Sequence, residues 1–203
     1  MLDTEGWDRR YAARDLVFSA QPAPIIEELV SPLRPGWGLD LGCGEGRHAL
    51  WLARQGWRVT AVDFSSVGLE KAKARAVALG VQIECVHADL YDYRPPPDAF
   101  DLVLLAYVHP DPARRVPMFA RASEALRPGG HLVIVGRDLV DLDAGYGPSD
   151  PERRYTTDRL AAAFPSRVVL ERCEQVIRER RTAEGPRTLV DTVAWGRRPD
   201  APA

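Results

Sequence analysis

Three glycines at alternate positions, Gly42, Gly44 and Gly46, form the stretch of this sequence best suited to hold a ligand. Glycine has no Cβ, so the backbone can turn sharply there and a ligand can approach it closely. An apolar run, 37–41, leads into the glycines, and a helical pattern follows them. A strand, a glycine turn and a helix N-terminus together make a nucleotide-type site. Because Asp40 also precedes the glycines, we favour such a site over a tight turn without a ligand.

Two further acidic residues stand where strands are expected to end. Asp63 closes the run 57–63, and Asp89 follows the run 81–86. Open α/β sheets bind ligands at the carboxyl ends of their strands, where a carboxylate can accept hydrogen bonds from two vicinal ribose hydroxyls. The alternative for Asp63 is a cap for the helix that follows it. With the glycine turn nearby, we predict a ribose contact.

Few residues are placed for proton transfer. His109 follows the fourth expected strand and is the best candidate for a general base, with Tyr107, Tyr11 and Asp138 as weaker candidates. The alternative for His109 is a plain loop residue before a proline. Trp7 and Tyr11 lie four positions apart and share one face of a short polar helix at 3–14. We expect residues 1–20 to form a lid segment over a ligand, to pack on the domain, or to do both.

The elements that position these residues alternate between strand and helix. Alternation predicts a parallel sheet with helices on both faces, and two long strand-like runs close the chain. The prediction is an α/β fold, a single Rossmann-like domain at 21–198 with a seven-stranded, mostly parallel sheet and a C-terminal antiparallel hairpin. The charges of the hairpin are expected to form a solvated edge. The expected strands are 37–41, 57–63, 81–86, 100–107, 131–136, 167–181 and 186–197. The expected helices are 23–33, 48–55, 66–79, 112–126 and 157–164. Turns are expected at 127–130 and 183–185, and a long loop is expected at 139–155.

Composition narrows the class of protein. The chain has 203 residues, 45% of them hydrophobic, and a formal net charge of −2, so it has no strong positive field for nonspecific nucleic-acid binding. Its three cysteines are widely spaced, which argues against a disulfide framework or a metal site. The first residues do not read as a signal peptide, and no apolar run approaches the length of a membrane span. We expect a cytoplasmic protein without a membrane partner.

The glycine pattern separates two cofactor classes. Nicotinamide enzymes use G-x-G-x-x-G, which would need glycine at the position of Arg47. The stretch 40–46 instead resembles the first motif of class I S-adenosylmethionine-dependent methyltransferases. Asp63, Asp89-Leu90, the stretch 126–130 and the terminal hairpin match other features of that superfamily. Within it, the N-terminal aromatics and the stretch 40–48 look most like small bacterial methyltransferases related to tellurite-resistance and thiopurine methyltransferase-like proteins.

The resemblance implies S-adenosylmethionine as cofactor and assigns residues to it. Gly42 and Gly44 would let the backbone pass close to the aminoacyl part, and Asp40 would orient its ammonium. Arg47 would reach the carboxylate or lie on an exposed helix face. The implied contacts with the rest of the cofactor are Asp63 to the ribose, Asp89 and Leu90 to the adenine and Ala106 to the methionine part, and the set also includes Trp7, Cys43 and Phe64.

The function expected from this resemblance is transfer of a methyl group, by in-line displacement, to a small-molecule acceptor. A general base is optional when the acceptor atom is already a strong nucleophile. The alternative is a non-catalytic sensor or partner subunit that only binds the cofactor. A nicotinamide oxidoreductase is a third and weaker hypothesis. The stretch 106–109 lacks the Asn/Asp-Pro-Pro-Tyr motif of amino-nucleobase methyltransferases, which argues against DNA adenine. Residues 3–18, 139–155 and the loop after Tyr107 are expected to line the acceptor pocket, whereas the acceptor and the oligomeric state stay open.

Overall fold

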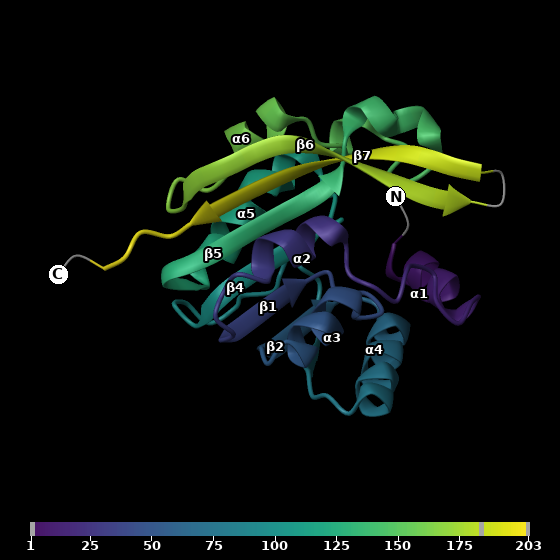
Figure 1. The fold of residues 1–203 in the computed structure, drawn as a ribbon, viewed down its shortest axis with the longest axis horizontal. Helices are drawn as coiled ribbons and strands as arrows, with labels where there is room; N and C mark the ends of the chain where they lie inside the picture. Colours follow the sequence, from purple (N-terminus) through teal and green to yellow (C-terminus); the bar gives the residue numbers. More distant parts are fainter. Residues whose placement is uncertain (1–2, 183–184, 202–203) are drawn as a thin grey trace.

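A computed structural model of the protein describes residues 3–182 and 185–201, which form a seven-stranded sheet with helices on both faces (Figure 1). The strand order is β3-β2-β1-β4-β5-β7-β6. The pairs from β3 to β5 are parallel, and β7 pairs antiparallel with both β5 and β6. The predicted fold class is therefore confirmed. The strands are β1 (Trp37–Leu41), β2 (Arg58–Asp63), β3 (Glu84–His87), β4 (Phe100–Ala106), β5 (Leu126–Arg137), β6 (Val169–Thr182) and β7 (Gly185–Arg197); the helices are α1 (Thr4–Ala12), α2 (Pro24–Val30), α3 (Arg47–Arg54), α4 (Ser66–Leu79), α5 (Pro112–Glu124) and α6 (Thr157–Ala163).

Both faces of the central strands are buried, which explains why they read as continuous apolar runs. In β4, Leu102 and Leu104 belong to a core shared with α2 and α3, whereas Val103 and Leu105 belong to the core under α5 and α6. The sheet order changes direction between β1 and β4, which are neighbours in space. Ligands of open α/β sheets bind at such a switch point, outside the carboxyl ends of the strands.

The stretch 127–130, predicted as a turn, forms the first part of β5 instead. The pairing of β4 with β5 shifts between Phe100 and Leu102, and Gly129 has a φ of +79°. Backbone hydrogen bonds hold this distortion in place: the Gly129 N–H donates to the Arg198 carbonyl (3.0 Å), and the Arg198 N–H to the Gly130 carbonyl (2.8 Å). The glycines thus form an irregularity within a strand. Of the predicted hairpin turn 183–185, residues 183 and 184 lie outside the described residues.

The segment 139–155, predicted as a long loop, contains two 3₁₀ helices, η1 (Leu139–Ala144) and η2 (Pro151–Arg153). Arg154 holds the segment together, and its side chain is among the largest fully buried ones. Its guanidinium donates to four backbone carbonyls, those of Asp138, Leu142, Tyr146 and Pro148. Backbone oxygens thus take the place of water around this buried cation.

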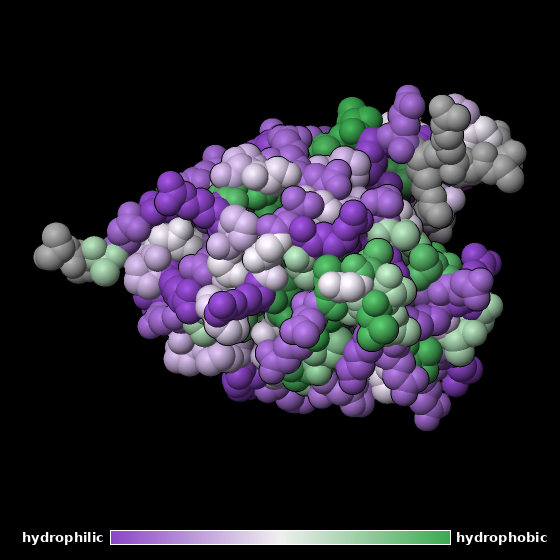
Figure 2. Space-filling view, turned by 60° about the horizontal axis from the view of Figure 1, so that its bottom comes forward, coloured by the Kyte–Doolittle hydropathy of each residue, from purple (hydrophilic) through white to green (hydrophobic). Residues whose placement is uncertain are grey.

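In the part of the chain that the structure describes, no helix is long and apolar enough to cross a membrane. Figure 2 turns the lower side of the molecule forward and shows a mosaic in which hydrophilic side chains prevail. Hydrophobic side chains gather toward the centre right of that view. Single exposed apolar side chains, such as Val77 and Leu79 of α4, are common on folded proteins.

Candidate functional site

The glycine turn lies between the end of β1 and the start of α3, as predicted. Gly42, Gly44 and Gly46 have φ values of +78°, +52° and +78°, a region that favours glycine. A Cβ added to Gly42 would come within 2.5 Å of Val108 Cγ2, and one on Gly44 within 2.5 Å of the Tyr11 hydroxyl oxygen. The turn therefore requires glycine both for its backbone conformation and for the close approach of its neighbours.

Asp63 ends β2 and fixes the shape of this turn. One carboxylate oxygen accepts from the Gly44 N–H (2.7 Å) and the other from the Ser65 N–H (2.8 Å). Burial raises the pKa of Asp63, and the hydrogen bonds from backbone amides oppose that shift. Ser65 itself caps α4 through its hydroxyl, which accepts from the Gly68 N–H (3.0 Å). The Asp63 carboxylate has lone pairs left for a ligand, since a carboxylate offers about four acceptor positions; its contact with ribose stays a prediction.

Asp40 is a deeply buried acidic group of the site, with 1% of its surface exposed. Its Oδ2 atom accepts from the Ala49 N–H in the first turn of α3 (3.1 Å), whereas Oδ1 has no hydrogen-bond partner among the described residues. Burial raises its pKa to about 7. A buried, unpaired carboxylate oxygen is costly unless a ligand supplies a donor. An ammonium group at Oδ1 fits this need, and the cofactor implied by the sequence carries one.

The N-terminal segment packs directly on the glycine turn. Tyr11 is buried against Gly44, and its ring centroid lies 5.4 Å from that of Trp7. Burial raises the pKa of Tyr11. Asp8 accepts a hydrogen bond from the Ser65 hydroxyl and so joins α1 to the start of α4. Of the two expectations for this segment, packing on the domain is confirmed, and closure over a ligand stays a prediction.

Glu45 and Lys71 hold the segment after α1, and neither was recognised in the sequence. The buried Glu45 carboxylate accepts from the Val17 N–H (3.0 Å) and pairs with Lys71 Nζ (3.1 Å). Lys71 also donates to the backbone carbonyls of Tyr11 and Arg14. An acidic residue inside the glycine turn and a lysine inside a predicted helix are sequence signals, but they do not reveal that the two meet.

Tyr107 follows β4 at the carboxyl edge of the sheet, with a φ of +62° that is rare for a residue other than glycine. Its hydroxyl donates to Asp191 Oδ2 (2.8 Å), and burial raises its pKa. Two guanidinium groups lie over its ring, with their central carbons 4.8 Å (Arg47) and 5.8 Å (Arg178) from the ring centroid. Arg47 is half-buried against this ring, so the expectation of an exposed helix face for it is wrong.

His109 points toward β5 and the 139–155 segment. Its Nδ1 atom lies 3.1 Å from the Arg153 carbonyl, and its Nε2 atom accepts from the Arg137 N–H (3.2 Å). Burial lowers its pKa to about 4, so the ring is neutral at pH 7. With both ring nitrogens bonded to backbone, the geometry favours a role in positioning two segments over a role as general base. The general-base role stays a prediction that the structure does not support.

The remaining predicted cofactor residues lie around the same edge. Leu90 Cδ1 is 3.5 Å from where a Cβ on Gly42 would be, so the segment after β3 reaches the glycine turn. Asp89 is exposed and accepts from the Tyr91 N–H (2.8 Å). Cys43 is buried in the turn, and Ala106 is buried at the end of β4. The Phe64 carbonyl lies 2.9 Å from a ring nitrogen of His87. Their contacts with a cofactor stay predictions.

Asp191 of β7 shows that the hairpin is not only a solvated edge. This side chain is 1% exposed and accepts from Tyr107, from Arg137 (2.8 Å) and from Arg178 (2.6 Å). Arg137 also donates to Asp141 (2.9 Å). The expectation of a solvated edge is thus wrong for these residues, because β7 pairs with β5 and brings its inward side chains to the site. A single aspartate within the apolar run 189–195 was the available signal, since a buried charge needs partners.

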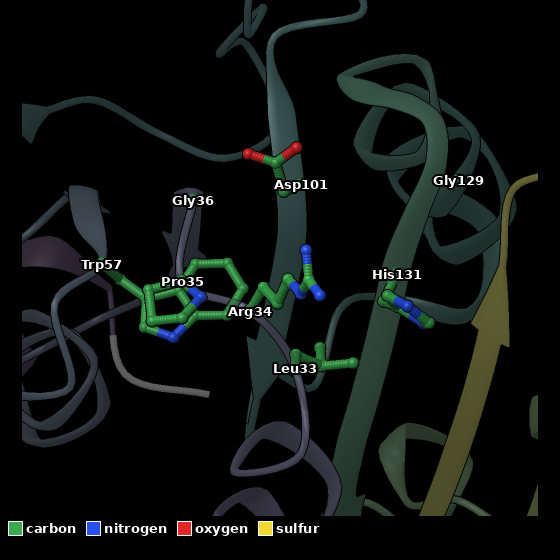
Figure 3. Close-up of a pocket in the computed structure, with 8 residues that line it drawn as sticks. All are labelled: Leu33, Arg34, Pro35, Gly36, Trp57, Asp101, Gly129 and His131. Atoms are coloured by element: carbon green, nitrogen blue, oxygen red, sulfur yellow. The ribbon is translucent and has the colours of Figure 1, made fainter.

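Two pockets lie at opposite ends of the sheet. One, of about 280 Å³, is shown in Figure 3, where Arg34, Asp101 and His131 come from three different segments around the amino ends of the parallel strands. The other, of about 240 Å³, lies at the carboxyl ends between α3, Tyr107 and β6, and its lining residues are Ser19, Gln21, Pro22, Ala23, Pro24, Arg47, Tyr107 and Arg178. Ligands of open α/β sheets bind at the carboxyl ends, so only the second pocket belongs to the candidate site.

Comparison with known sequences supports the interpretation of the glycine turn. Residues 39–130 match the family described as "Methyltransferase domain". The chain is 32% identical over 150 residues to a ubiquinone biosynthesis O-methyltransferase of Methylobacterium sp. (strain 4-46), covering 63% of this chain and 57% of the relative. It is 32% identical over 112 residues to ribosomal RNA small subunit methyltransferase C of Alcanivorax borkumensis, covering 52% and 34%. The chain thus spans about a third to somewhat over half the length of these relatives.

Solved structures agree on the fold. A protein from work on the conversion of a disulfide bond into a thioacetal group during echinomycin biosynthesis superimposes with a TM-score of 0.74 at 22% identity, covering 98% of this chain and 94% of that one. The N-methyltransferase NodS of Bradyrhizobium japonicum WM9, in complex with S-adenosyl-L-homocysteine, gives 0.70 at 20% identity, covering 97% and 98%. TehB of Haemophilus influenzae gives 0.72 at 17% identity, covering 87% and 62%.

These identities are low, so the solved structures support the fold alone, and the narrower resemblance to tellurite-resistance and thiopurine methyltransferases stays a prediction. Fold, matched domain and glycine turn agree with one another, however. The turn carries Asp40, three glycines with positive φ and a hydrogen bond to Asp63. The methyltransferase domain match covers that turn and the strands on both sides of the switch point. The chain therefore carries a methyltransferase domain over residues 39–130, in a fold that it shares with the N-methyltransferase NodS.

Proposed function

We propose that the protein transfers a methyl group from S-adenosylmethionine to a small-molecule acceptor. The observation that carries the proposal is the unpaired, buried Oδ1 atom of Asp40 beside the glycine turn at the switch point of the sheet. The cofactor supplies an electrophilic methyl group on a sulfonium centre and an ammonium group that suits this oxygen. The match of residues 39–130 to a methyltransferase domain supports the same function.

In this proposal Asp40 binds the ammonium, and Gly42 and Gly44 leave room for the aminoacyl part. Asp63 accepts from the ribose hydroxyls while it keeps its bond to the Gly44 N–H. The remaining proposed cofactor contacts are Asp89 and the Leu90 amide at the adenine, Ala106 at the methionine part, and Trp7, Cys43 and Phe64 at the rim.

Positioning and exclusion of water are the main work of the residues around the transferring group. Residues 1–20 act as the lid segment of the domain at 21–198, with Tyr11 placed against Gly44. Tyr107 orients the acceptor through its ring, because its hydroxyl is engaged with Asp191. The acceptor then needs either its own nucleophilic atom or a base from outside this set, since both nitrogens of His109 are engaged.

A small-molecule acceptor is favoured over a nucleic acid by the net charge of −2 and by the size of the pocket at the carboxyl edge, about 240 Å³. One relative is a ribosomal RNA methyltransferase and another acts in ubiquinone biosynthesis, so an RNA acceptor is the outcome that the assay has to separate. We also propose a cytoplasmic location, in keeping with three free cysteines. Cell fractionation tests this location.

Calorimetry with S-adenosyl-L-homocysteine and with S-adenosylmethionine tests cofactor binding. Asp63→Ala is expected to weaken binding about tenfold to hundredfold, because it removes charge-assisted hydrogen bonds. Asp158→Ala, at an exposed position of α6, is the matched control and should bind as the wild type does. Folded protein that does not bind either form of the cofactor at millimolar concentration refutes the proposal.

Catalysis is tested separately by following S-adenosyl-L-homocysteine release with a panel of phenols, thiols, amines, carboxylic acids and ribosomal RNA. Turnover with small molecules and none with RNA is the expected result. Cofactor binding without turnover on any panel member would favour the non-catalytic sensor or partner subunit.

A further inference from the structure

Arg47 is a cation without an ion-pair partner among the described residues, whereas the neighbouring Arg178 is paired with Asp191. It begins α3 directly after the glycine turn, is half-buried and lines the pocket at the carboxyl edge together with Tyr107 and Arg178. Among the described residues it makes no hydrogen bond and no ion pair; its guanidinium rests on the rings of Tyr107 and Phe18. A guanidinium held this way keeps its hydrogen-bond donors for a ligand.

The charges around the pocket leave one positive charge uncompensated. Arg178 donates through Nε to Asp191 (2.6 Å), and Arg137 donates both to Asp191 (2.8 Å) and to Asp141 (2.9 Å). Two guanidiniums thus pair with two carboxylates, and Arg47 is a third cation that neither carboxylate contacts. Burial lowers the pKa of Arg47; Tyr107, Asp40 and Asp191 oppose this shift, and Arg178 adds to it. The pocket is electrostatically suited to one negative charge.

The pocket adjoins the proposed cofactor position without being part of it. Of its lining residues, only Arg47 carried an expectation of a cofactor contact, with the cofactor carboxylate. One wall comes from Arg178 of β6, which is separated from β4 by β5 and β7 in the sheet. Another wall is the segment between the lid and α2, represented by Gln21 and Pro22. A ligand here would therefore lie on the acceptor side of the glycine turn.

We propose that this pocket binds the carboxylate group of a small organic acceptor, with Arg47 as its ion-pair partner and Tyr107 lining the space for the rest of the molecule. This inference rests on the proposed function. Arginine matches a carboxylate in a bidentate geometry, and a single uncompensated charge suits a monoanion better than a phosphate dianion. The volume of about 240 Å³ exceeds that of a cavity of about 150 Å³ that holds benzene, so one aromatic ring with a carboxylate fits.

The test uses benzoate as probe and benzamide as its neutral counterpart, titrated by ligand-observed NMR into protein saturated with S-adenosyl-L-homocysteine. Wild-type protein is expected to bind benzoate at least about tenfold more tightly than benzamide, the effect of a charge-assisted pair. Arg47→Met should reduce benzoate binding to the benzamide level, and Arg47→Lys should retain part of the preference. Arg54→Met, at the exposed end of α3, is the matched control. Arg47→Gln serves as a second neutral variant if the first does not fold.

Calorimetry with S-adenosyl-L-homocysteine on the same variants separates this inference from the proposed function. The expected result is cofactor affinity within about twofold of the wild type in Arg47→Met, since the proposal gives Arg47 no cofactor contact. A loss of about tenfold or more would assign Arg47 to the cofactor carboxylate and overturn the inference, although the proposed function would stand. Equal binding of benzoate and benzamide by cofactor-loaded wild type, or stronger competition by inorganic phosphate than by benzoate, would also overturn it. Wild-type protein that does not bind the cofactor would refute the proposed function first.

Discussion

Replacing Asp40 with asparagine should make the protein more resistant to unfolding as the pH rises. Asp40 is 1% exposed, one of its oxygens has no partner among the described residues, and its pKa is raised to about 7 by burial. An acid whose native pKa lies above its unfolded value gives its full stability below the unfolded pKa and loses it as the pH rises toward the native pKa. Asparagine has nearly the same shape and can keep the bond from the Ala49 N–H, but it does not titrate.

The size of the effect follows from two pKa values, about 7 for Asp40 in the native state and 3.8 for an ordinary aspartate, which represents the unfolded chain. Each pKa unit corresponds to about 1.4 kcal/mol. Between pH 5 and pH 8 the wild type should therefore lose roughly 3 kcal/mol of unfolding free energy relative to Asp40→Asn. Differences in packing or in the unpaired amide add a constant that does not change with pH, so the widening of the gap is the quantity to measure.

Urea unfolding of both proteins at pH 5, 6, 7 and 8, without cofactor, gives this gap directly. The slope of the unfolding free energy with urea should be the same in both, because the surface exposed on unfolding is the same. Asp101→Asn, at the other end of the sheet and partly exposed, is the control for replacing one aspartate by asparagine. A gap between wild type and Asp40→Asn that stays constant within about 0.5 kcal/mol from pH 5 to pH 8 would refute the argument that burial raises the pKa of Asp40 to about 7.

Two further predictions concern the lid segment. Gly44→Ala would place a Cβ 2.5 Å from the Tyr11 hydroxyl oxygen at a φ of +52°, so hydrogen exchange should accelerate in α1. Adding Tyr11→Phe to this variant should restore part of the protection of α1. Unchanged exchange in Gly44→Ala alone would contradict the packing argument. Lys71→Met removes the donor to the carbonyls of Tyr11 and Arg14 and the partner of Glu45, so residues 11–18 should exchange about tenfold faster or more, as expected for loss of charged hydrogen bonds. Lys71→Arg should exchange at a rate close to the wild type, and equal rates in all three proteins would refute a role for Lys71 in holding the segment.

Local patterns predicted the glycine turn and the elements around it well. β1 has the predicted bounds, and α4 also agrees with its predicted range. The glycines were recognisable because the conformation they adopt and the chain on both sides of them lie within about ten residues. The antiparallel hairpin was predictable for the same reason, since two long runs stand close together in the sequence.

Contacts between distant parts of the chain were not predictable in this way. Asp191 meets Tyr107 across 84 positions, and Lys71 meets Glu45 across 26. His109 illustrates the consequence: its place after β4 suggested a base, but Arg137 and Arg153 from later segments occupy its two nitrogens. Arg154 lies in a segment that was predicted as a loop, but its side chain is buried and donates to four backbone carbonyls. Residue type and strand position therefore located the site, whereas the partners that decide what each residue can do came from the fold.

The titration of Asp40 connects the stability of the free protein with the affinity for its proposed cofactor. If the ammonium binds only the ionised carboxylate, affinity for S-adenosyl-L-homocysteine should fall as the pH drops below about 7, approaching tenfold per unit. Deprotonation of Asp40 then lowers the unfolding free energy of the free protein and also creates the carboxylate that binds the ammonium. The bound ammonium supplies the hydrogen-bond donor that Oδ1 lacks. Asp40→Asn should remove both effects together, leaving a protein that is relatively more stable at pH 8 and binds weakly at every pH. A variant that lost the pH dependence of stability but kept that of binding would show that another group near the glycine turn governs the affinity.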